Sequence, residues 1–275
     1  MRAAILQSCT GIDPAANAQA LTAAIGHAAV EGADMLFTPE MSGLLDRDRA
    51  RAAGAIVTEA EDRVLAAACA AAARAGLWVH LGSLALRAGD GDERFVNRGF
   101  VIDGDGAIRA RYDKIHLFDV DLPGGERWRE SEAYVPGGRS VVVETPWGRI
   151  GLAICYDLRF PDLFRALSDA GATILSVPAA FTVPTGQAHW HVLLRARAIE
   201  AGAFVVAAAQ AGRHEDGRST YGHSLAVDPW GEVLVDMEGA PGMAVVDLEP
   251  SRLLEARARV PALAHRRPIG QVEIA

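Results

Sequence analysis

The chain has 275 residues, enough to bury a hydrophobic core in one large domain or two small ones. Its 27 Lys and Arg residues against 35 Asp and Glu residues give a formal net charge of −8. Nucleic acids and anionic membranes require a positively charged protein face, so we expect neither as the main partner.

The three cysteines, Cys9, Cys69 and Cys155, show neither a metal-ligand spacing nor a disulfide framework, which is typical of a reducing compartment. The apolar stretch at the start of the chain is too short for a signal peptide. The Ala-rich segment 65–75 contains an arginine and is shorter than a membrane span. We therefore expect a cytoplasmic protein that does not bind a membrane.

Strand and helix patterns alternate in the first third of the chain. In chain order we expect a strand over residues 3–7, a helix over 14–31, a strand over 33–37, a helix over 58–75 and a strand over 77–84. Asp13 before Pro14 is typical of a helix start. Thr58 and Glu61 have the spacing of a capping box, which predicts the start of the next helix at Thr58.

Hairpins and a long loop are expected among the later elements. Residues 101–106, 144–149 and 227–232 each join two apolar arms through a tight turn, which predicts three hairpins. The polar stretch 119–138 is expected to be a long surface loop, a kind of segment that is often functional. The other expected elements are a strand over 150–154, a helix from Pro161, a helix over 187–201 and a strand over 203–209.

Neither a linker rich in Pro, Gly or Ser nor an internal repeat divides the chain. We expect a single domain over residues 1–275, of the α/β class, with two stacked sheets whose outer faces are covered by helices. The glycine pairs lack the strand–loop–helix context of a phosphate cradle, and the sequence indicates no cofactor.

Cys155 lies where the apolar run 150–154 ends, just before a predicted helix. A thiol on such a turn is held rigidly at the edge of the core, within reach of a substrate. Buried cysteines more often only fill space, however, so the position alone assigns no function. The same holds for Glu40 and Lys114 at strand ends and for Glu130 in the polar loop, since isolated charges are usually solvated.

Taken together, these segments resemble the nitrilase superfamily of carbon–nitrogen hydrolases. The resemblance spans nearly the whole chain in the expected order and is carried by residues 38–40 (Thr-Pro-Glu), 112–119 (Tyr-Asp-Lys-Ile-His-Leu-Phe-Asp), 151–161 (Gly-Leu-Ala-Ile-Cys-Tyr-Asp-Leu-Arg-Phe-Pro), 178–182, 185–190, 195–200, 221–224 and 228–231. It implies a four-layer α-β-β-α sandwich that pairs into a homodimer across a two-fold axis, or assembles into a higher homo-oligomer.

The family's Glu–Lys–Cys triad carries over onto Glu40, Lys114 and Cys155. A free thiol is mostly protonated at neutral pH, so the resemblance implies that Glu40 is the general base for attack of Cys155 on an amide carbonyl. Lys114 is implied to stabilise the oxyanion together with the backbone N–H of Tyr156. Water then hydrolyses the thioester, and the products are a carboxylic acid and an amine or ammonia.

The resemblance also implies a supporting glutamate in the polar loop. We assign it to Glu130 because the family pattern favours this position over Glu126 and Glu132. A buried lysine tends to lose its charge, and two nearby carboxylates oppose that loss. Glu130 is therefore expected to keep Lys114 charged and to orient the substrate amide.

The histidines are not needed for this chemistry, because Glu40 fills the role of the base. His189 and His191 are two residues apart on an expected helix, which places them on different faces and argues against a metal pair. His116 and His223 are interpreted as structural hydrogen-bonding residues. We expect no metal site.

Reaction type is indicated by the residues that follow the nucleophile. Tyr156 and Asp157 stand where family members that cleave nitriles have tryptophan and glutamate, so the resemblance implies an amide substrate. Carbamoylases of the family also carry a different polar run there. Segment 185–212 is most similar to the branch that hydrolyses deaminated glutathione, an amide-bearing α-keto acid. The ω-amidases, which act on α-ketoglutaramate, match this segment less well.

An α-keto acid requires a cationic or hydrogen-bonding grip on its carboxylate. We expect Arg159 to provide it, with Tyr156, Phe181 and Thr182 lining the pocket for this small-molecule substrate. A structural ion pair is the alternative role for Arg159.

Two positions depart from the family pattern. His191 stands where glutamate is common and Ala179 where serine is common, so both bear on the substrate more than on the reaction. A non-catalytic binding or interaction module is the alternative from another class, and the complete set of Glu40, Lys114, Glu130 and Cys155 argues against it.

Overall fold

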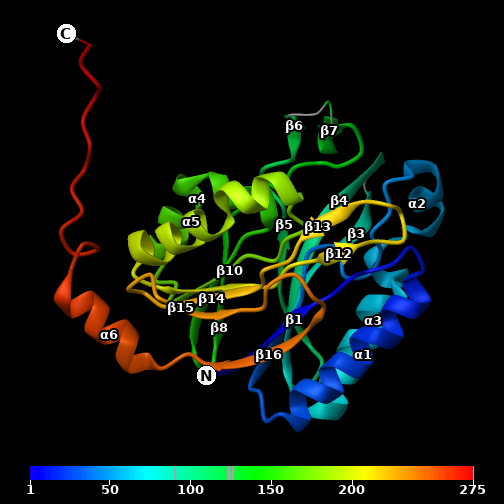
Figure 1. Cartoon of the computed structure of the whole chain (residues 1–275), viewed down its shortest axis with the longest axis horizontal. Helices are drawn as coiled ribbons and strands as arrows, with labels where there is room; N and C mark the ends of the chain where they lie inside the picture. Colours follow the sequence, from blue (N-terminus) through cyan, green and yellow to red (C-terminus); the bar gives the residue numbers. More distant parts are fainter. Residues whose placement is uncertain (90, 123–124, 126, 275) are drawn as a thin grey trace.

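Successive side chains of the first strands enter two different cores. This alternation produces the layers of the fold that Figure 1 shows. The computed structural model describes residues 1–89, 91–122, 125 and 127–274. In β1 (Arg2–Gln7), Ala3 and Ile5 join the core that contains both sheets, whereas Ala4 joins the core formed with helices α1 and α3. Side chains alternate across a strand, so this continuous apolar run requires cover on both faces.

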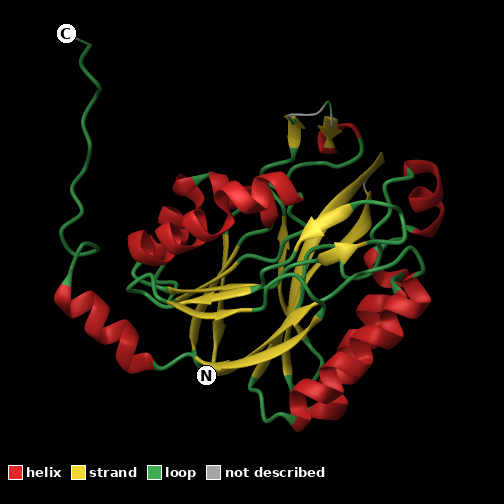
Figure 2. Cartoon of the chain, viewed as in Figure 1, coloured by secondary structure: helices red, strands yellow, loops and turns green. Residues whose placement is uncertain are grey.

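Two six-stranded sheets lie face to face (Figure 2). The first has the order β16 (Gly242–Asp247), β1, β2 (Met35–Phe37), β3 (Trp78–Gly89), β4 (Asp92–Ile102), β5 (Ile108–Asp113). The second has the order β15 (Val233–Asp236), β14 (Leu225–Val227), β11 (Phe204–Ala207), β10 (Ile174–Ser176), β9 (Gly148–Leu152), β8 (Val141–Thr145). Strands β1–β2–β3 and β9–β10–β11 run parallel, and the other neighbours are antiparallel.

Helices cover the outer face of each sheet. On the first sheet lie α1 (Pro14–Val30) and α3 (Arg63–Ala75), and on the second lie α4 (Pro161–Asp169) and α5 (Val183–Ala201) (Figure 1). The layer order is helix, sheet, sheet, helix, which confirms the predicted α-β-β-α sandwich. The shorter helix α2 (Arg49–Ala55) flanks the first sheet, and α6 (Pro250–Arg259) with the segment after it extends away from both sheets.

The helix expected over 58–75 begins later than predicted. Thr58 and Glu61 do form the capping box, but it caps a short 3₁₀ helix, Glu59–Glu61. Helix α3 starts at Arg63, and its N-cap is Asp62, whose carboxylate accepts the Leu65 amide at 2.7 Å. Two capping signals within five residues made the start ambiguous, and the second one starts the α-helix. At α1 the expected cap is confirmed, since Asp13 accepts the Ala15 amide.

The polar stretch 119–138 is not the long irregular loop that we expected. It contains a hairpin, β6 (Asp119–Asp121) with β7 (Arg127–Arg129), followed by a 3₁₀ helix, Glu130–Glu132. The three predicted hairpins are confirmed as β4–β5, β8–β9 and β14–β15. A further two-stranded pair joins β12 (Ala211–Arg213) to β13 (Ser219–Tyr221). Among the described residues, no helix combines the length and apolar composition needed to cross a membrane.

Candidate active site

Four side chains from different segments meet in one buried cluster. Glu40 follows β2, Lys114 follows β5, Glu130 opens the 3₁₀ helix after β7, and Cys155 lies three residues beyond β9. Glu40, Lys114 and Cys155 expose 5%, 2% and 7% of their surfaces. We call these four residues the Cys155 cluster. The two sheets therefore contribute to it jointly, since β2 and β5 belong to the first and β9 to the second.

Lys114 lies between the two carboxylates of the cluster. Its Nζ is 3.0 Å from Glu40 Oε1 and 2.9 and 3.1 Å from the two oxygens of Glu130. The remaining acceptor capacity is also used, because Glu40 Oε2 accepts the Ala180 amide and Glu130 Oε2 accepts the Phe118 amide. Buried charges are stable only when they are paired in this way. Lys114 is also the sole lysine of the chain, a sequence signal that our sequence analysis did not use.

Asn97 on β4 belongs to this site and was missed by sequence analysis. It is 1% exposed, and its Nδ2 donates to Glu40 Oε1 at 2.9 Å and lies 3.4 Å from Glu130 Oε1. One amide group therefore orients both carboxylates toward Lys114. Within the described residues its Oδ1 has no hydrogen-bond partner. An asparagine directly after the apolar pair Phe95-Val96, near the middle of β4, was the available signal.

The thiol of Cys155 is protonated in the free protein. Burial and the Glu40 carboxylate raise the pKa of this thiol well above its ordinary value, and the charge of Lys114 offsets only part of the rise. A nucleophilic thiolate therefore forms only when a base takes the proton. The group placed to do so is Glu40.

Glu40 and Lys114 are both charged. Burial raises the pKa of Glu40, but the charge of Lys114 and the hydrogen bonds that the carboxylate accepts outweigh burial and lower it. Burial likewise lowers the pKa of Lys114, but the charges of Glu130 and Glu40 outweigh it and raise the pKa well above its ordinary value. The cluster thus brings together a protonated thiol, a charged carboxylate that can act as a base, and a fixed ammonium cation, in a site largely shielded from water.

Cys155 occupies a strained turn. Its φ is +51°, in the left-handed region that residues other than glycine rarely adopt. The turn is held on one side by the Cys155 amide, which donates to the Pro178 carbonyl at 2.9 Å. On the other side the Asp157 carboxylate accepts the Ile154 amide at 2.9 Å. Within the described chain the Tyr156 amide has no acceptor, so it is available as the oxyanion donor that we expected.

Asp157 anchors this turn to the first sheet. It is fully buried and accepts the Tyr112 hydroxyl at 2.7 Å and the His116 amide at 3.0 Å. His116 Nδ1 lies 2.7 Å from the same carboxylate, and its ring stacks on Phe160 at 3.5 Å. Our interpretation of His116 as a structural hydrogen-bonding residue agrees with these contacts. Asp157 was noted from the sequence only as a mark of the substrate class, and its anchoring contacts were not foreseen.

Arg159 lies between two aromatic rings. Its guanidinium is 5.8 Å from the ring centre of Tyr156 and 5.6 Å from that of Phe181, and its Nη1 lies 3.2 Å from His189 Nδ1. No acidic side chain in the described part of the chain forms an ion pair with it, which argues against the alternative of a structural ion pair. Thr182 is 8% exposed, and its hydroxyl contacts Thr185 at 2.8 Å, so it contributes less to this surface than we expected.

The other glutamates and the departures from the family pattern lie elsewhere. Glu132 is exposed and pairs with Arg49 at 2.7 Å, and Glu126 lies outside the described residues. Ala179 is fully buried beside the cluster, one residue before Ala180. His191 does not touch the Cys155 cluster; its Nε2 lies 2.9 Å from Asp236.

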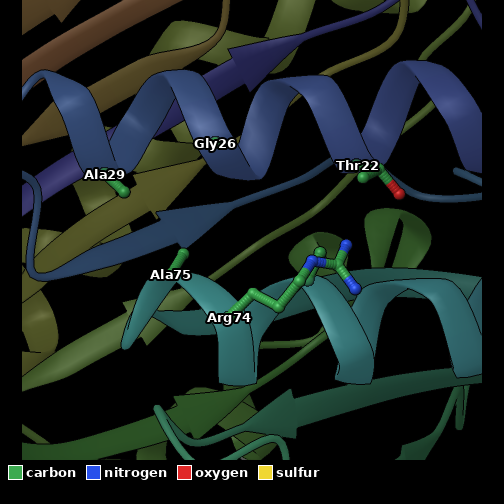
Figure 3. A pocket seen from close by; sticks show the side chains of 6 residues that line it. Thr22, Gly26, Ala29, Arg74 and Ala75 are labelled. Carbon is green, nitrogen blue, oxygen red and sulfur yellow. The ribbon is translucent and has the colours of Figure 1, made fainter.

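A separate groove lies between α1 and α3, on the outer helical layer (Figure 3). Its lining residues are Thr22, Gly26, Ala29, Ala71, Arg74 and Ala75. Figure 3 shows the Arg74 side chain extending between the two helices. The groove contains no member of the Cys155 cluster, and its mostly small, apolar walls offer no nucleophile or base.

Comparisons with known proteins agree with this geometry. The carbon–nitrogen hydrolase family profile matches residues 2–258. The deaminated glutathione amidase of Yersinia enterocolitica is 46% identical over 197 residues, which are 71% of this chain and 69% of the relative. The deaminated glutathione amidase of Homo sapiens is 40% identical over 268 residues, or 96% and 82% of the two chains.

Solved structures share the fold over almost the entire chain. The NitFhit protein of Caenorhabditis elegans superposes with a TM-score of 0.88 at 38% identity, over 97% of this chain and 65% of that one. An amidase from Nesterenkonia sp. AN1, solved after Michael addition of acrylamide at its active-site cysteine, has a TM-score of 0.78 at 27% identity, over 96% and 99%. The family match and the amidase relatives identify a hydrolase that acts on amides. The chain belongs to the carbon–nitrogen hydrolase family.

Proposed function

We propose that this protein hydrolyses the amide bond of deaminated glutathione through a thioester on Cys155. The observation that carries the proposal is the position of Lys114, whose ammonium bridges Glu40 and Glu130 beside a buried, protonated thiol. A base, a nucleophile and a fixed cation are the groups that acyl transfer requires. The deaminated glutathione amidases at 40–46% identity support the choice of substrate.

The first half of the reaction transfers the acyl group to sulfur. Glu40 takes the thiol proton as the Cys155 sulfur attacks the amide carbonyl. Lys114 and the Tyr156 amide stabilise the negative charge that develops on the carbonyl oxygen. Glu40 then returns the proton to the departing nitrogen, which leaves as cysteinylglycine when the substrate is deaminated glutathione.

The second half returns the free enzyme. Glu40 takes a proton from a water molecule, which attacks the thioester carbonyl, and the same two donors stabilise the second oxyanion. Collapse of this intermediate breaks the C–S bond and releases the α-keto dicarboxylic acid, and the proton on Glu40 returns to the Cys155 sulfur. Throughout, Glu130 keeps Lys114 charged, and Asn97 orients both carboxylates.

We further propose that Arg159 binds a carboxylate of the substrate. Its guanidinium has two aromatic neighbours and one histidine but no acidic partner within the described residues. A planar, permanently charged fork of this kind matches a carboxylate in geometry and charge. Tyr156 and Phe181 provide the apolar walls that position the guanidinium.

Arg159→Met is expected to raise KM for deaminated glutathione by roughly 10- to 100-fold, because a hydrogen bond to a charged group contributes about 1.5–3 kcal/mol. The KM for a neutral amide of similar size should stay unchanged. Steady-state kinetics on deaminated glutathione, α-ketoglutaramate and neutral amides, with mass-spectrometric detection of both products, measures this difference.

Arg165→Met is the matched control, since Arg165 is exposed on α4 and pairs with Asp169. An equal rise of KM for neutral and for carboxylate-bearing substrates in Arg159→Met contradicts the role of Arg159. Preference of the wild-type protein for α-ketoglutaramate favours ω-amidase activity, the second candidate. Failure to hydrolyse every amide in the panel contradicts the proposed function itself.

A homodimer formed through α5 is a further proposal. Val192 and Ile199 are seven residues apart on one face of α5 and are 69% and 53% exposed. Trp230, 54% exposed, lies in the adjacent β14–β15 turn, which is tied to α5 by a 2.7 Å hydrogen bond from Arg195 to the Gly231 carbonyl. Exposed apolar patches of this kind mark interaction surfaces.

Light scattering is expected to give twice the 29.1 kDa mass of the chain. Val192→Glu and Ile199→Glu should give the mass of one chain, because each places a charge in an apolar interface. Val30→Glu is the control: Val30 is 85% exposed at the end of α1, in the opposite helical layer. A wild-type mass of one chain contradicts the proposal, as does an equal effect of all three substitutions.

Residues 1–275 are proposed to form one domain, supported by a family match that leaves few residues uncovered. A cytoplasmic location is proposed from the three cysteines, which are free in the structure. Limited proteolysis that releases two stable fragments contradicts the first proposal, and cell fractionation tests the second.

A further inference from the structure

Two histidines and an aspartate from three segments meet outside the Cys155 cluster. His191 lies on α5, His223 lies between β13 and β14, and Asp236 ends β15. His191 Nε2 is 2.9 Å from Asp236 Oδ2, and His223 Nδ1 is 2.9 Å from Asp236 Oδ1. One potential ligand atom from each residue lies within 4.8 Å of the others.

We propose that His191, His223 and Asp236 bind a divalent transition-metal ion of the Zn²⁺ or Ni²⁺ class. Imidazole nitrogen and carboxylate oxygen are the ligands that these ions accept, and two histidines with one carboxylate form a common three-residue set. Metal–ligand bonds of about 2.0–2.1 Å separate neighbouring ligand atoms by about 2.8–3.0 Å in octahedral geometry and about 3.3–3.4 Å in tetrahedral geometry. The nitrogen–oxygen separations of 2.9 and 3.2 Å agree with these values, and the full set of three ligand atoms, within 4.8 Å of one another, reaches them by small side-chain rotations.

The backbone around the cluster holds these side chains in place. His223 has a φ of +53°, in the left-handed region, and its amide donates to the Glu238 carbonyl at 2.6 Å. The His223 carbonyl accepts the Trp190 indole N–H at 2.7 Å, which fixes it to α5 next to His191. Tyr221 stacks on the His223 ring at 4.3 Å. Ligands that are oriented before an ion arrives bind it more tightly.

The position of the carboxylate and the exposure of the three side chains also suit a bound metal ion. The Asp236 carboxylate lies between the two imidazoles, and its Oδ1 also accepts the Glu238 amide at 2.9 Å, so an oxygen ligand faces both histidines. The side chains of His191, His223 and Asp236 are 33%, 25% and 31% exposed. An ion from solution therefore reaches all three, and water completes its coordination.

The test is titration of the untagged full-length chain with Zn²⁺ and Ni²⁺ by isothermal calorimetry at neutral pH. We expect one ion per chain and no binding of Mg²⁺, which prefers oxygen ligands. His191→Gln, Asp236→Asn and His223→Asn should each weaken binding by about tenfold or more, as expected when one ligand is lost. Asparagine is chosen at position 223 because it tolerates a positive φ.

Matched controls distinguish this site from other ligands of the chain. His27→Gln removes an exposed histidine that pairs with Glu31 on α1, and it should leave binding unchanged. Cys155→Ser and Cys9→Ser should also leave it unchanged, which excludes thiol ligation. Co²⁺ bound to the wild-type chain should show visible bands without thiolate charge transfer, a readout that does not depend on any variant folding.

Three results overturn the proposal. One is the absence of saturable Zn²⁺ and Ni²⁺ binding by the wild-type chain. Another is a thiolate charge-transfer band with Co²⁺ or loss of the ion in Cys155→Ser, either of which assigns the ion to a thiol. The third is full affinity in His191→Gln and Asp236→Asn chains whose circular dichroism is unchanged.

Discussion

Cys155→Ala is expected to lower kcat on deaminated glutathione by on the order of 10⁴-fold or more, because the covalent path through the thioester is lost. The fold should persist, since alanine removes one sulfur atom from a side chain that is 7% exposed. Initial rates with product detection by mass spectrometry measure the loss. In the wild-type protein, acid quenching during turnover should trap an acyl adduct on Cys155.

The other two cysteines provide the control. Cys9 is exposed and Cys69 half-buried, and neither contacts the Cys155 cluster. Cys9→Ala and Cys69→Ala should therefore retain wild-type activity. Activity that survives in Cys155→Ala, or an acyl adduct on another cysteine, contradicts the mechanism even if the substrate is correct.

Lys114→Met is expected to abolish activity and to lower the free energy of unfolding by roughly 3–5 kcal/mol. The substitution removes the cation that lies within 3.1 Å of both Glu40 and Glu130, so two buried carboxylates are left unpaired. Methionine has a similar volume, which separates the effect of charge from that of packing. Urea unfolding at neutral pH measures the stability change.

The loss of stability should shrink as the pH falls. In the wild-type protein the pKa of Glu40 is lowered, so its contribution to stability is fully present above the ordinary pKa of a glutamate and is lost as the pH falls from there through the lowered pKa. In Lys114→Met the lowering cause is absent and burial raises the pKa of Glu40, so protonation in mild acid relieves the unpaired charge. The difference between the two proteins is therefore largest at neutral pH.

Two further variants sharpen the result. Adding Glu40→Gln and Glu130→Gln to Lys114→Met removes all three charges and should restore most of the stability without any activity. Arg111→Met on β5 is the control for loss of a cation, since Arg111 is half exposed and pairs with Glu59 at the surface. An exposed pair contributes about 0–1 kcal/mol, so a similar loss in both single variants contradicts the interpretation.

Local sequence patterns predicted most elements of this fold because their causes are local. Turn residues determined the three hairpins, and Asp13 before Pro14 determined the start of α1. The same reasoning was wrong at Thr58 and Asp62, where two helix-capping signals compete. It was also wrong over 119–138, where a polar stretch forms a hairpin. Cross-strand pairing in such a stretch depends on main-chain hydrogen bonds, and a polar side-chain pattern does not indicate them.

The residues expected to carry the chemistry were identified from long motifs around Glu40, Lys114 and Cys155. Asn97 escaped notice because its role depends on carboxylates 57 and 33 residues away along the chain. Asp157 was noticed only as a mark of the substrate class, since its anchoring contacts lie 41 and 45 residues away, on β5 and in the segment after it. Such contacts follow from sheet order and register, which no short segment contains.

The histidines show most clearly which features follow from local sequence and which follow from the tertiary structure. The sequence by itself determined that two sheets stack, that a thiol lies on a turn, and which residue types surround it. Periodicity and turn chemistry suffice for this because they act over a few residues. The sequence placed His189 and His191 on different faces of one helix, and in the structure their neighbours are Arg159 and Asp236 respectively. Only the tertiary structure brings His191 to His223 and Asp236, and Lys114 to its two glutamates, because stacking two sheets joins segments that are distant in sequence.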